Sequence, residues 1–280
     1  MLFLFLSEVI IFGKKFEEVF AEMINNSRVV REQYNTADNL NTRISIHEKY
    51  SVNKQGFNNW IFSNYDISPN MEILELGCGT GELWKSKLPL SINGVKIILT
   101  DFSEGMVSAV RENFKDCANV SYDTVNIENI PYGDGRFDRV VANMMLYHVP
   151  DIDRGLSEVK RVMADDGYFY CATYGENGII PYIAGLLKEY GVTDNANCNF
   201  TLQNGESILR KFFSYVKRLD YEDALAVTDI DDILDYIYSM SGILSVARLD
   251  RSTVKEVLEK NMENGVLKIP KEYGMFICAK

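Results

Sequence analysis

A glycine-rich turn after an apolar run is the segment that most clearly indicates chemistry. Residues 73–76 (I-L-E-L) predict a buried strand, and Gly77, Gly79 and Gly81 follow it at alternate positions. Glycines let a chain turn tightly and approach a ligand closely. Glu75 lies inside the strand, where a buried carboxylate is costly unless it accepts hydrogen bonds. We therefore predict a ligand-binding loop in which Glu75 holds backbone N–H groups or a ligand ammonium.

A second acidic residue follows this loop at a spacing that suits ribose binding. Asp101 ends the next apolar run, twenty residues after Gly81. Where a strand, a glycine-rich loop and a helix bind a nucleotide, an acidic residue about 20 positions after the glycines binds the ribose hydroxyls. The alternative is a solvated helix cap, a role that Ser103 could take instead. The G-x-G-x-G spacing, together with Glu75, makes a nicotinamide dehydrogenase, with its G-x-G-x-x-G loop, an unfavourable interpretation.

Histidine, the side chain that exchanges protons near neutral pH and most often binds metals, is scarce. The chain has two histidines, His47 and His148, and five cysteines, none in a C-x-x-C spacing. Two histidines exclude a histidine-rich metal site, and an odd number of cysteines indicates neither a disulfide framework nor a zinc knuckle. We therefore expect no metal, and the thiols suit a reducing cytoplasm.

The elements that must position these residues alternate between strands and helices. Short apolar runs predict strands at 71–76, 95–100, 120–126, 137–143 and 168–173, with helices at 81–87, 103–114 and 151–163 and a turn at 165–167. Strands separated by helices of about ten residues are typical of β-α-β units and a parallel sheet. Helical spacing predicts helices within 14–64, and at 179–190, 205–213, 229–240 and 253–264, with further strands at 215–221 and 273–279.

Composition and charge narrow the class of partner. The 280 residues are 46% apolar and 25% charged, which is ordinary for a globular protein with a sizeable core. The net charge is −11 without a cluster of lysine and arginine, which disfavours nucleic acid and an anionic membrane surface. The apolar residues 1–12 are too short for a membrane span and lack the features of a signal peptide. A small molecule is therefore the expected partner.

A run of about 100 residues resembles a known enzyme family. Residues 73–81 (I-L-E-L-G-C-G-T-G) resemble motif I of the class I S-adenosylmethionine-dependent methyltransferases, and residues 97–106 (I-I-L-T-D-F-S-E-G-M) resemble the second strand of that family. Residues 125–132 and 137–150 resemble the ends of its third and fourth strands. Residues 156–171 resemble the helix, turn and strand that follow.

The resemblance implies a cofactor, S-adenosylmethionine, and the residues that bind it. Asp101 would bind the ribose hydroxyls, and Phe102 and Met106 would flank the adenine, although core packing alone also accounts for these two. Asn126 stands where the family usually has an aspartate facing the adenine amino group; its amide oxygen can still accept that bond. For Asn143, ligand contact and turn capping are both open. The implied cofactor-binding set is Glu75, Gly77, Cys78, Gly79, Gly81, Asp101, Phe102, Met106, Asn126, Ile127, Asn143 and Tyr50.

The substrate side is less determined by the resemblance. N-terminal helices of related small-molecule methyltransferases often close over the cofactor, which places Tyr34 and His47 as candidate substrate contacts, although a solvated helix face also accounts for His47. Tyr147 and Tyr174 follow predicted strands and complete the substrate-binding set. His148 is the candidate general base, with a loop residue that only shapes the pocket as the alternative.

The resemblance also implies the fold class and its divisions. We expect a Rossmann-like α/β fold with a seven-stranded, mostly parallel sheet between helices, the last strand antiparallel. Residues 1–66 would form an N-terminal helical lid, 67–174 the cofactor-binding core, 175–213 an inserted helical cap after the fifth strand, and 214–280 the rest of the core. The expected function is a cytoplasmic methyltransferase of a small molecule. A protein or RNA target and a non-catalytic cofactor-binding module are the alternatives; the sequence leaves the acceptor and the oligomeric state open.

Overall fold

The computed structural model describes residues 10–11, 14–15, 37–85, 87, 94–240 and 242–280. Tyr34, most of the apolar start and the helices predicted between residues 16 and 36 lie outside these residues. The strands β1 (Ile10–Ile11) and β2 (Lys14–Lys15) form a two-residue antiparallel pair. The prediction of a helix from residue 14 is therefore wrong at its first two residues.

A seven-stranded sheet forms the centre of the protein, in the order β5-β4-β3-β6-β7-β9-β8. Neighbouring strands from β5 to β7 are parallel, and β9 lies antiparallel between β7 and β8. This confirms the predicted Rossmann-like sheet with an antiparallel last strand. The strands are β3 (Glu72–Leu76), β4 (Lys96–Asp101), β5 (Val120–Thr124), β6 (Phe137–Val141), β7 (Met163–Tyr174), β8 (Tyr215–Val227) and β9 (Leu267–Ala279).

Helices cover both faces of the sheet because successive strand residues point to opposite sides. Leu74 and Leu76 of β3 pack in one core cluster with α6 (Ile152–Val162) and α8 (Gly205–Leu209). Ile73, the residue before Leu74, packs in the opposite cluster with α4 (Phe57–Ser63) and α5 (Glu104–Asn113). The carboxyl ends of β3, β4, β5 and β6 consequently meet at one edge between two helical layers.

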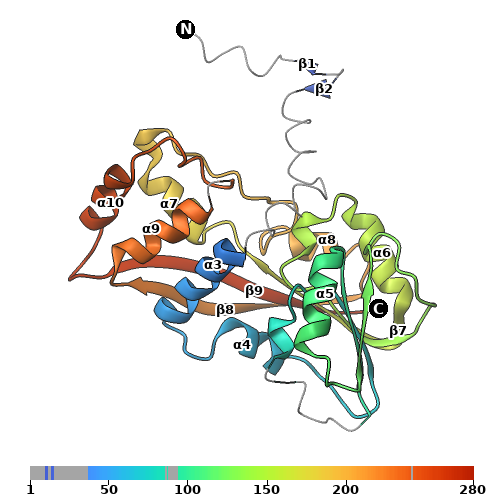
Figure 1. The fold of residues 1–280 in the computed structure, drawn as a ribbon. Coiled ribbons are helices and arrows are strands. Elements are labelled where there is room, and N and C mark those ends of the chain that lie inside the picture. Colours follow the sequence, from blue (N-terminus) through green and yellow to red (C-terminus); the bar gives the residue numbers. More distant parts are fainter. Residues whose placement is uncertain (1–9, 12–13, 16–36, 86, 88–93, 241) are drawn as a thin grey trace.

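A third hydrophobic cluster lies around the parts of β8 and β9 that extend beyond β7. Only β8 pairs with residues 267–272 of β9, because β7 ends where Tyr174 meets Tyr273. Both strands are thus longer than predicted. The helices α3 (Ala37–Tyr50), α7 (Ile179–Leu186), α9 (Ile230–Ser239) and α10 (Arg251–Lys260) gather around this ribbon, to the left in Figure 1. Ile46 of α3 is buried in this cluster, so the N-terminal helix and the C-terminal part of the chain share one core.

Several predicted boundaries differ from the structure. The turn expected at 165–167 lies within β7, where the register shifts between the pairs Phe137↔Met163 and Arg139↔Tyr168. The extra residues form an irregularity, which accounts for their turn-like composition. The helix expected at 81–87 is a 3₁₀ turn, η2 (Glu82–Trp84), and those expected at 205–213 and 253–264 end earlier, at Leu209 and Lys260. Every helix in the described part of the chain is too short or too polar to cross a bilayer.

Candidate functional site

The glycine loop leaves β3 at the edge where the strand ends meet. Gly77, Gly79 and Gly81 all have positive φ angles, of 71°, 55° and 82°, which only glycine adopts without strain. A Cβ atom on Gly81 would lie 2.4 Å from the Phe114 ring, so this glycine allows close packing against α5. A Cβ on Gly79 would meet no protein atom within 4 Å. Gly79 therefore borders open space that a ligand can occupy.

Glu75 is buried directly beneath this loop, with 3% of its surface exposed. Its carboxylate accepts a hydrogen bond of 2.6 Å from the indole N–H of Trp84, a partner that the sequence did not reveal. Burial raises the pKa of Glu75 to about 7; the bond from Trp84 opposes the rise and the charge of Asp101 adds to it. Positive charge arriving at this position would therefore stabilise the ionised carboxylate.

Asp101 ends β4 beside the loop. One carboxylate oxygen accepts from the backbone N–H of Gly79 at 3.0 Å and the other from that of Ser103 at 2.8 Å. Burial raises the pKa of Asp101, and these backbone donors oppose the rise. Asp101 thus braces the loop and the start of α5, and each oxygen retains a lone pair for a further donor. Cys78 joins the same strand end, because its N–H donates to Thr100 O at 2.8 Å.

The side chains expected around an adenine border the neighbouring strand ends. Phe102 follows β4 and is 40% exposed, whereas Met106 on α5 is half-buried. Asn126 is exposed after β5, and its amide oxygen accepts from the Glu128 N–H at 2.9 Å. Ile127 is buried in the core cluster under α6. An exposed aromatic ring at this edge, with Asn126 one strand away, leaves room for a planar group.

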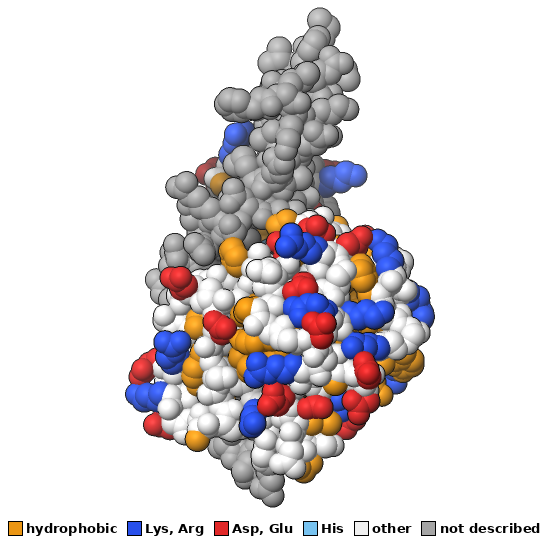
Figure 2. All heavy atoms as spheres, turned by 90° about the vertical axis from the view of Figure 1, so that its right-hand side faces the viewer, with side chains coloured by type: hydrophobic (Ala, Val, Ile, Leu, Met, Phe, Trp, Pro, Cys, Tyr) orange, Lys and Arg blue, Asp and Glu red, His pale blue; other side chains and the backbone are white. Residues whose placement is uncertain are grey.

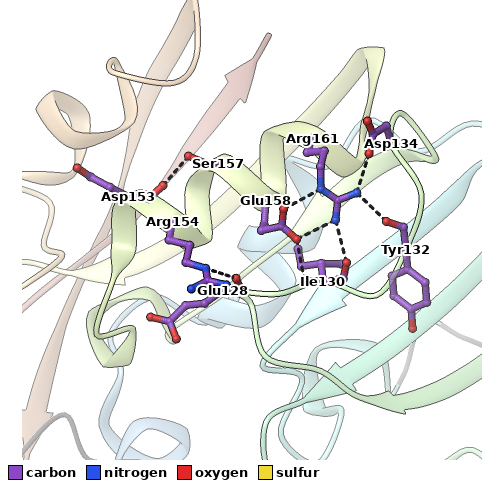
Figure 3. Close-up of polar contacts among 9 residues, drawn as sticks. All are labelled: Glu128, Ile130, Tyr132, Asp134, Asp153, Arg154, Ser157, Glu158 and Arg161. Carbon is purple, nitrogen blue, oxygen red and sulfur yellow. Dashed lines mark hydrogen bonds and ion pairs between the residues drawn. The ribbon is translucent and has the colours of Figure 1, made fainter.

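Side chains of α6 hold the loop that carries Asn126 and Ile127 (Figure 3). Arg161 donates to the carbonyls of Ile130 and Tyr132, at 2.8 Å each, and pairs with Asp134 at 2.7 Å. Glu158 pairs with Arg161 at 2.7 Å and accepts from the Ile130 N–H at 2.9 Å. The other bonds drawn join Arg154 to Glu128 O and Ser157 to Asp153 O. The side chains of α6 thus fix the loop, and the sequence pattern did not predict this role of Glu158 and Arg161.

Replacing Arg161 with glutamine is expected to lower the free energy of unfolding by about 2 kcal/mol, because three bonds to the loop are lost at about 1 kcal/mol each and the side chain is partly solvated. Urea unfolding measures the change. Lys115→Gln, which removes an exposed pair with Glu112, is the matched control and should alter stability by less than about 0.5 kcal/mol. Equal effects of the two substitutions would contradict the role of Arg161.

Asn143 after β6 is engaged by the protein. Its amide N–H donates to the Tyr65 hydroxyl at 2.6 Å, and its oxygen accepts from the Ala172 N–H at 3.2 Å. Tyr65, which the sequence did not single out, is partly buried, and its ring lies 4.7 Å from that of Tyr170. Burial raises the pKa of Tyr65 well above its ordinary value. These two bonds fix the Asn143 side chain at the end of β6, and both its contact with a ligand and turn capping stay predictions.

Three predicted residues meet beyond the end of β6. The Tyr147 ring lies 4.4 Å from that of His148 and 4.7 Å from that of Tyr174, at the end of β7. The Tyr174 hydroxyl donates to the carbonyl of Asn197 at 2.6 Å, which ties the segment after α7 to this group. Burial lowers the pKa of His148 to about 4, so the imidazole is neutral at pH 7.

The residues expected on α3 divide between two neighbours. The His47 ring lies 6.0 Å from that of Tyr273, the strand partner of Tyr174. Tyr50 donates its hydroxyl to Asp232 of α9 at 2.5 Å, and Arg43 donates to Ser239 at the end of that helix. This stripe of α3 therefore packs on the protein and is not a solvated face.

The fold and this site are typical of a class of proteins, the open α/β proteins, which bind ligands at the carboxyl ends of their parallel strands. Comparison with known proteins is more specific. Residues 74–171 match the family model described as a methyltransferase domain. Over these residues the chain is similar to methyltransferase domains, which supports the class I S-adenosylmethionine-dependent methyltransferase, with S-adenosylmethionine as cofactor, that the sequence predicts.

Individual relatives agree with this assignment. The chain is 29% identical over 142 residues to a malonyl-[acyl-carrier protein] O-methyltransferase of Geobacter sulfurreducens, covering 51% of this chain and 50% of the relative. It is 33% identical over 116 residues to a demethylmenaquinone methyltransferase of Beutenbergia cavernae, covering 41% and 46%. The YcgJ protein of Bacillus subtilis shares the fold, with a TM-score of 0.55, 16% identity and coverage of 79% and 96%. The chain spans about half the length of the curated relatives that it matches.

Proposed function

We propose that this protein is an enzyme that transfers a methyl group from S-adenosylmethionine to a small-molecule acceptor. The observation that carries the proposal is the open space at Gly79, beside the buried carboxylate of Glu75 and the half-buried carboxylate of Asp101. Two relatives are named as methyltransferases of malonyl-[acyl-carrier protein] and demethylmenaquinone, which supports this reaction class.

The residues present fit this cofactor. Ionised Glu75 would attract the ammonium, Asp101 would accept from the ribose hydroxyls, and Phe102, Met106 and Asn126 would surround the adenine. When bound, the cofactor supplies a methyl group activated by its sulfonium charge. The remaining task of the protein is to hold the acceptor in line with that methyl and to exclude water, since positioning is the main contribution to such a displacement.

We place the acceptor beyond the ends of β6 and β7, against Tyr147, Tyr174 and His47. His148 is neutral and could take a proton from an acceptor hydroxyl or amine. Residues 37–66 and the insertion 175–213 would form the cover. Lysine and arginine side chains are interspersed with acidic ones on the face shown in Figure 2, which supports a small molecule over RNA as the partner. The cytoplasm is the proposed compartment.

Calorimetric titration with S-adenosylmethionine tests the cofactor assignment. We expect saturable binding to the wild type and a loss of at least tenfold in affinity for Asp101→Ala and for Gly79→Ala, whose new methyl would occupy the space reserved for the ligand. Gly265→Ala is the control, because Gly265 also has a positive φ and its added Cβ also meets nothing within 4 Å, but it lies outside the site. No binding by the wild type, or unchanged binding by both site variants, would overturn the proposal.

A further inference from the structure

Three polar side chains converge where the sheet meets the hydrophobic cluster around the extended parts of β8 and β9. The His47 ring of α3 lies 6.1 Å from that of Tyr236 on α9 and 6.0 Å from that of Tyr273 on β9. His47 Nδ1 is buried, and no residue in the described ranges hydrogen-bonds to it. The hydroxyls of Tyr236 and Tyr273 form no hydrogen bond with another described residue. A buried polar atom without a partner, such as His47 Nδ1, is unusual, because nearly all polar groups inside proteins are paired.

The surroundings of these atoms are aromatic and continuous with the proposed methyl-transfer site. Tyr273 is paired in register with Tyr174, whose ring contacts that of Tyr147 beyond the end of β6. Neighbouring strands lie about 4.8 Å apart, so β9 is about 10 Å from β6, roughly the length of a substituted aromatic ring. Ligand sites typically combine apolar walls with a few convergent polar groups. The unpaired atoms mark the end of the site farthest from the cofactor.

The charges nearest this end are already neutralised. The Lys271 ammonium lies 5.1 Å from the Tyr273 ring, but it pairs with Asp223 at 2.6 Å and donates to the Ser51 hydroxyl at 2.9 Å. Arg43, one turn before His47, donates to the carbonyl of Ser239, where the α9 dipole is negative. Burial, with the Lys271 charge adding to it, lowers the pKa of His47 to about 3, so this ring is neutral as well.

We propose that His47, Tyr236 and Tyr273 bind the distal oxygen of a neutral, planar methyl acceptor. This inference rests on the proposed function. His47 Nδ1 accepts from a hydroxyl of the acceptor, and the two tyrosine hydroxyls donate to an oxygen. Asp223 is already paired and cannot neutralise a cationic acceptor, and Lys271 and Arg43 are already bonded and cannot neutralise an anionic one. The free energy of removing either ion from water would therefore not be repaid.

Three probes of similar size but different charge test the proposal by calorimetry on the full chain saturated with S-adenosylhomocysteine. They are 4-hydroxybenzyl alcohol, 4-hydroxybenzylamine as the cation and 4-hydroxybenzoate as the anion. We expect the alcohol to bind at least tenfold more tightly than either ion. His47→Phe, Tyr236→Phe and Tyr273→Phe keep the rings and should each weaken its binding about fivefold or more. Tyr215→Phe, at an exposed ring on β8, should leave it unchanged.

The outcomes separate this inference from the proposed function. Failure of S-adenosylhomocysteine to bind would contradict the proposed function, and binding of the alcohol would still support the site. If S-adenosylhomocysteine binds but the alcohol does not, or an ion binds as well, the acceptor class is wrong. The melting temperatures of the tyrosine variants provide a second readout: an unpaired hydroxyl predicts values no lower than the wild type, and a clear drop would show that the hydroxyls support the fold instead.

Discussion

Replacing Asp223 with alanine is expected to lower the free energy of unfolding by about 3–5 kcal/mol, the usual cost of leaving one partner of a buried ion pair alone. The Lys271 and Asp223 side chains are 2% and 0% exposed and lie 2.6 Å apart. Asp223 also accepts from the Ser51 hydroxyl and from the Asn53 N–H, at 2.8 and 3.0 Å. Burial disfavours its ionised form, but these donors, with Lys271, hold the pKa of Asp223 below its usual value. The alanine substitution leaves Lys271, the Ser51 hydroxyl and the Asn53 N–H without this acceptor.

Urea unfolding at pH 7 measures this loss, and the double variant Asp223→Leu, Lys271→Met is the control. Because an apolar pair needs no counter-charge, the double variant should recover most of the stability. Burial already lowers the pKa of Lys271, and Asp223 opposes that shift. In Asp223→Ala the pKa of Lys271 in the folded state falls further below its value in the unfolded state. The loss of unfolding free energy relative to the wild type should therefore shrink as the pH rises towards 10. A loss below about 1 kcal/mol, or one that is independent of pH, would contradict the buried-pair account.

Glu75→Gln is expected to change stability and cofactor binding in opposite directions. The folded pKa of about 7 exceeds the ordinary value of 4.5, so the folded state holds the proton more tightly than the unfolded state. Stability from this group is therefore greatest below pH 4.5 and declines as the pH rises to about 7, by about 3 kcal/mol in total. Glutamine carries no charge and can still accept from Trp84. The variant should therefore be more stable than the wild type by up to about 3 kcal/mol at pH 8 and should match it near pH 4.

Cofactor affinity should move the other way. Without the carboxylate, affinity for S-adenosylmethionine should fall at least tenfold, and its rise through pH 7 in the wild type should disappear. Unfolding and titration at several pH values give both measurements. Glu72→Gln is the control on the same strand, because Glu72 pairs at the surface with Arg136, 3.1 Å away. Lower stability of Glu75→Gln at pH 8, or full cofactor affinity, would show that the glutamate has a different role.

Features set by neighbouring residues could be predicted from the sequence. The glycine loop, the strand before it and Asp101 at the next strand end follow from turn chemistry and from apolar runs that act over a few positions. The alternation of strands and helices likewise predicted the parallel sheet. The boundaries of strands and helices were predicted less accurately. The turn predicted at 165–167 is a register irregularity in β7, because pairing with β6 outweighed the local turn preference.

The sequence by itself therefore determined the strands, the glycine loop and the strand-end residues of the half where we propose that the cofactor binds, because these elements lie in chain order around one loop. The tertiary structure alone decided which distant side chains meet: Trp84 under Glu75, Arg161 on the loop of Asn126, Lys271 with Asp223, and His47 with Tyr236 and Tyr273. These contacts depend on the antiparallel register of β8 and β9 and on the packing of α3 against α9. Register and packing are fixed by the whole core, so no local spacing contains them.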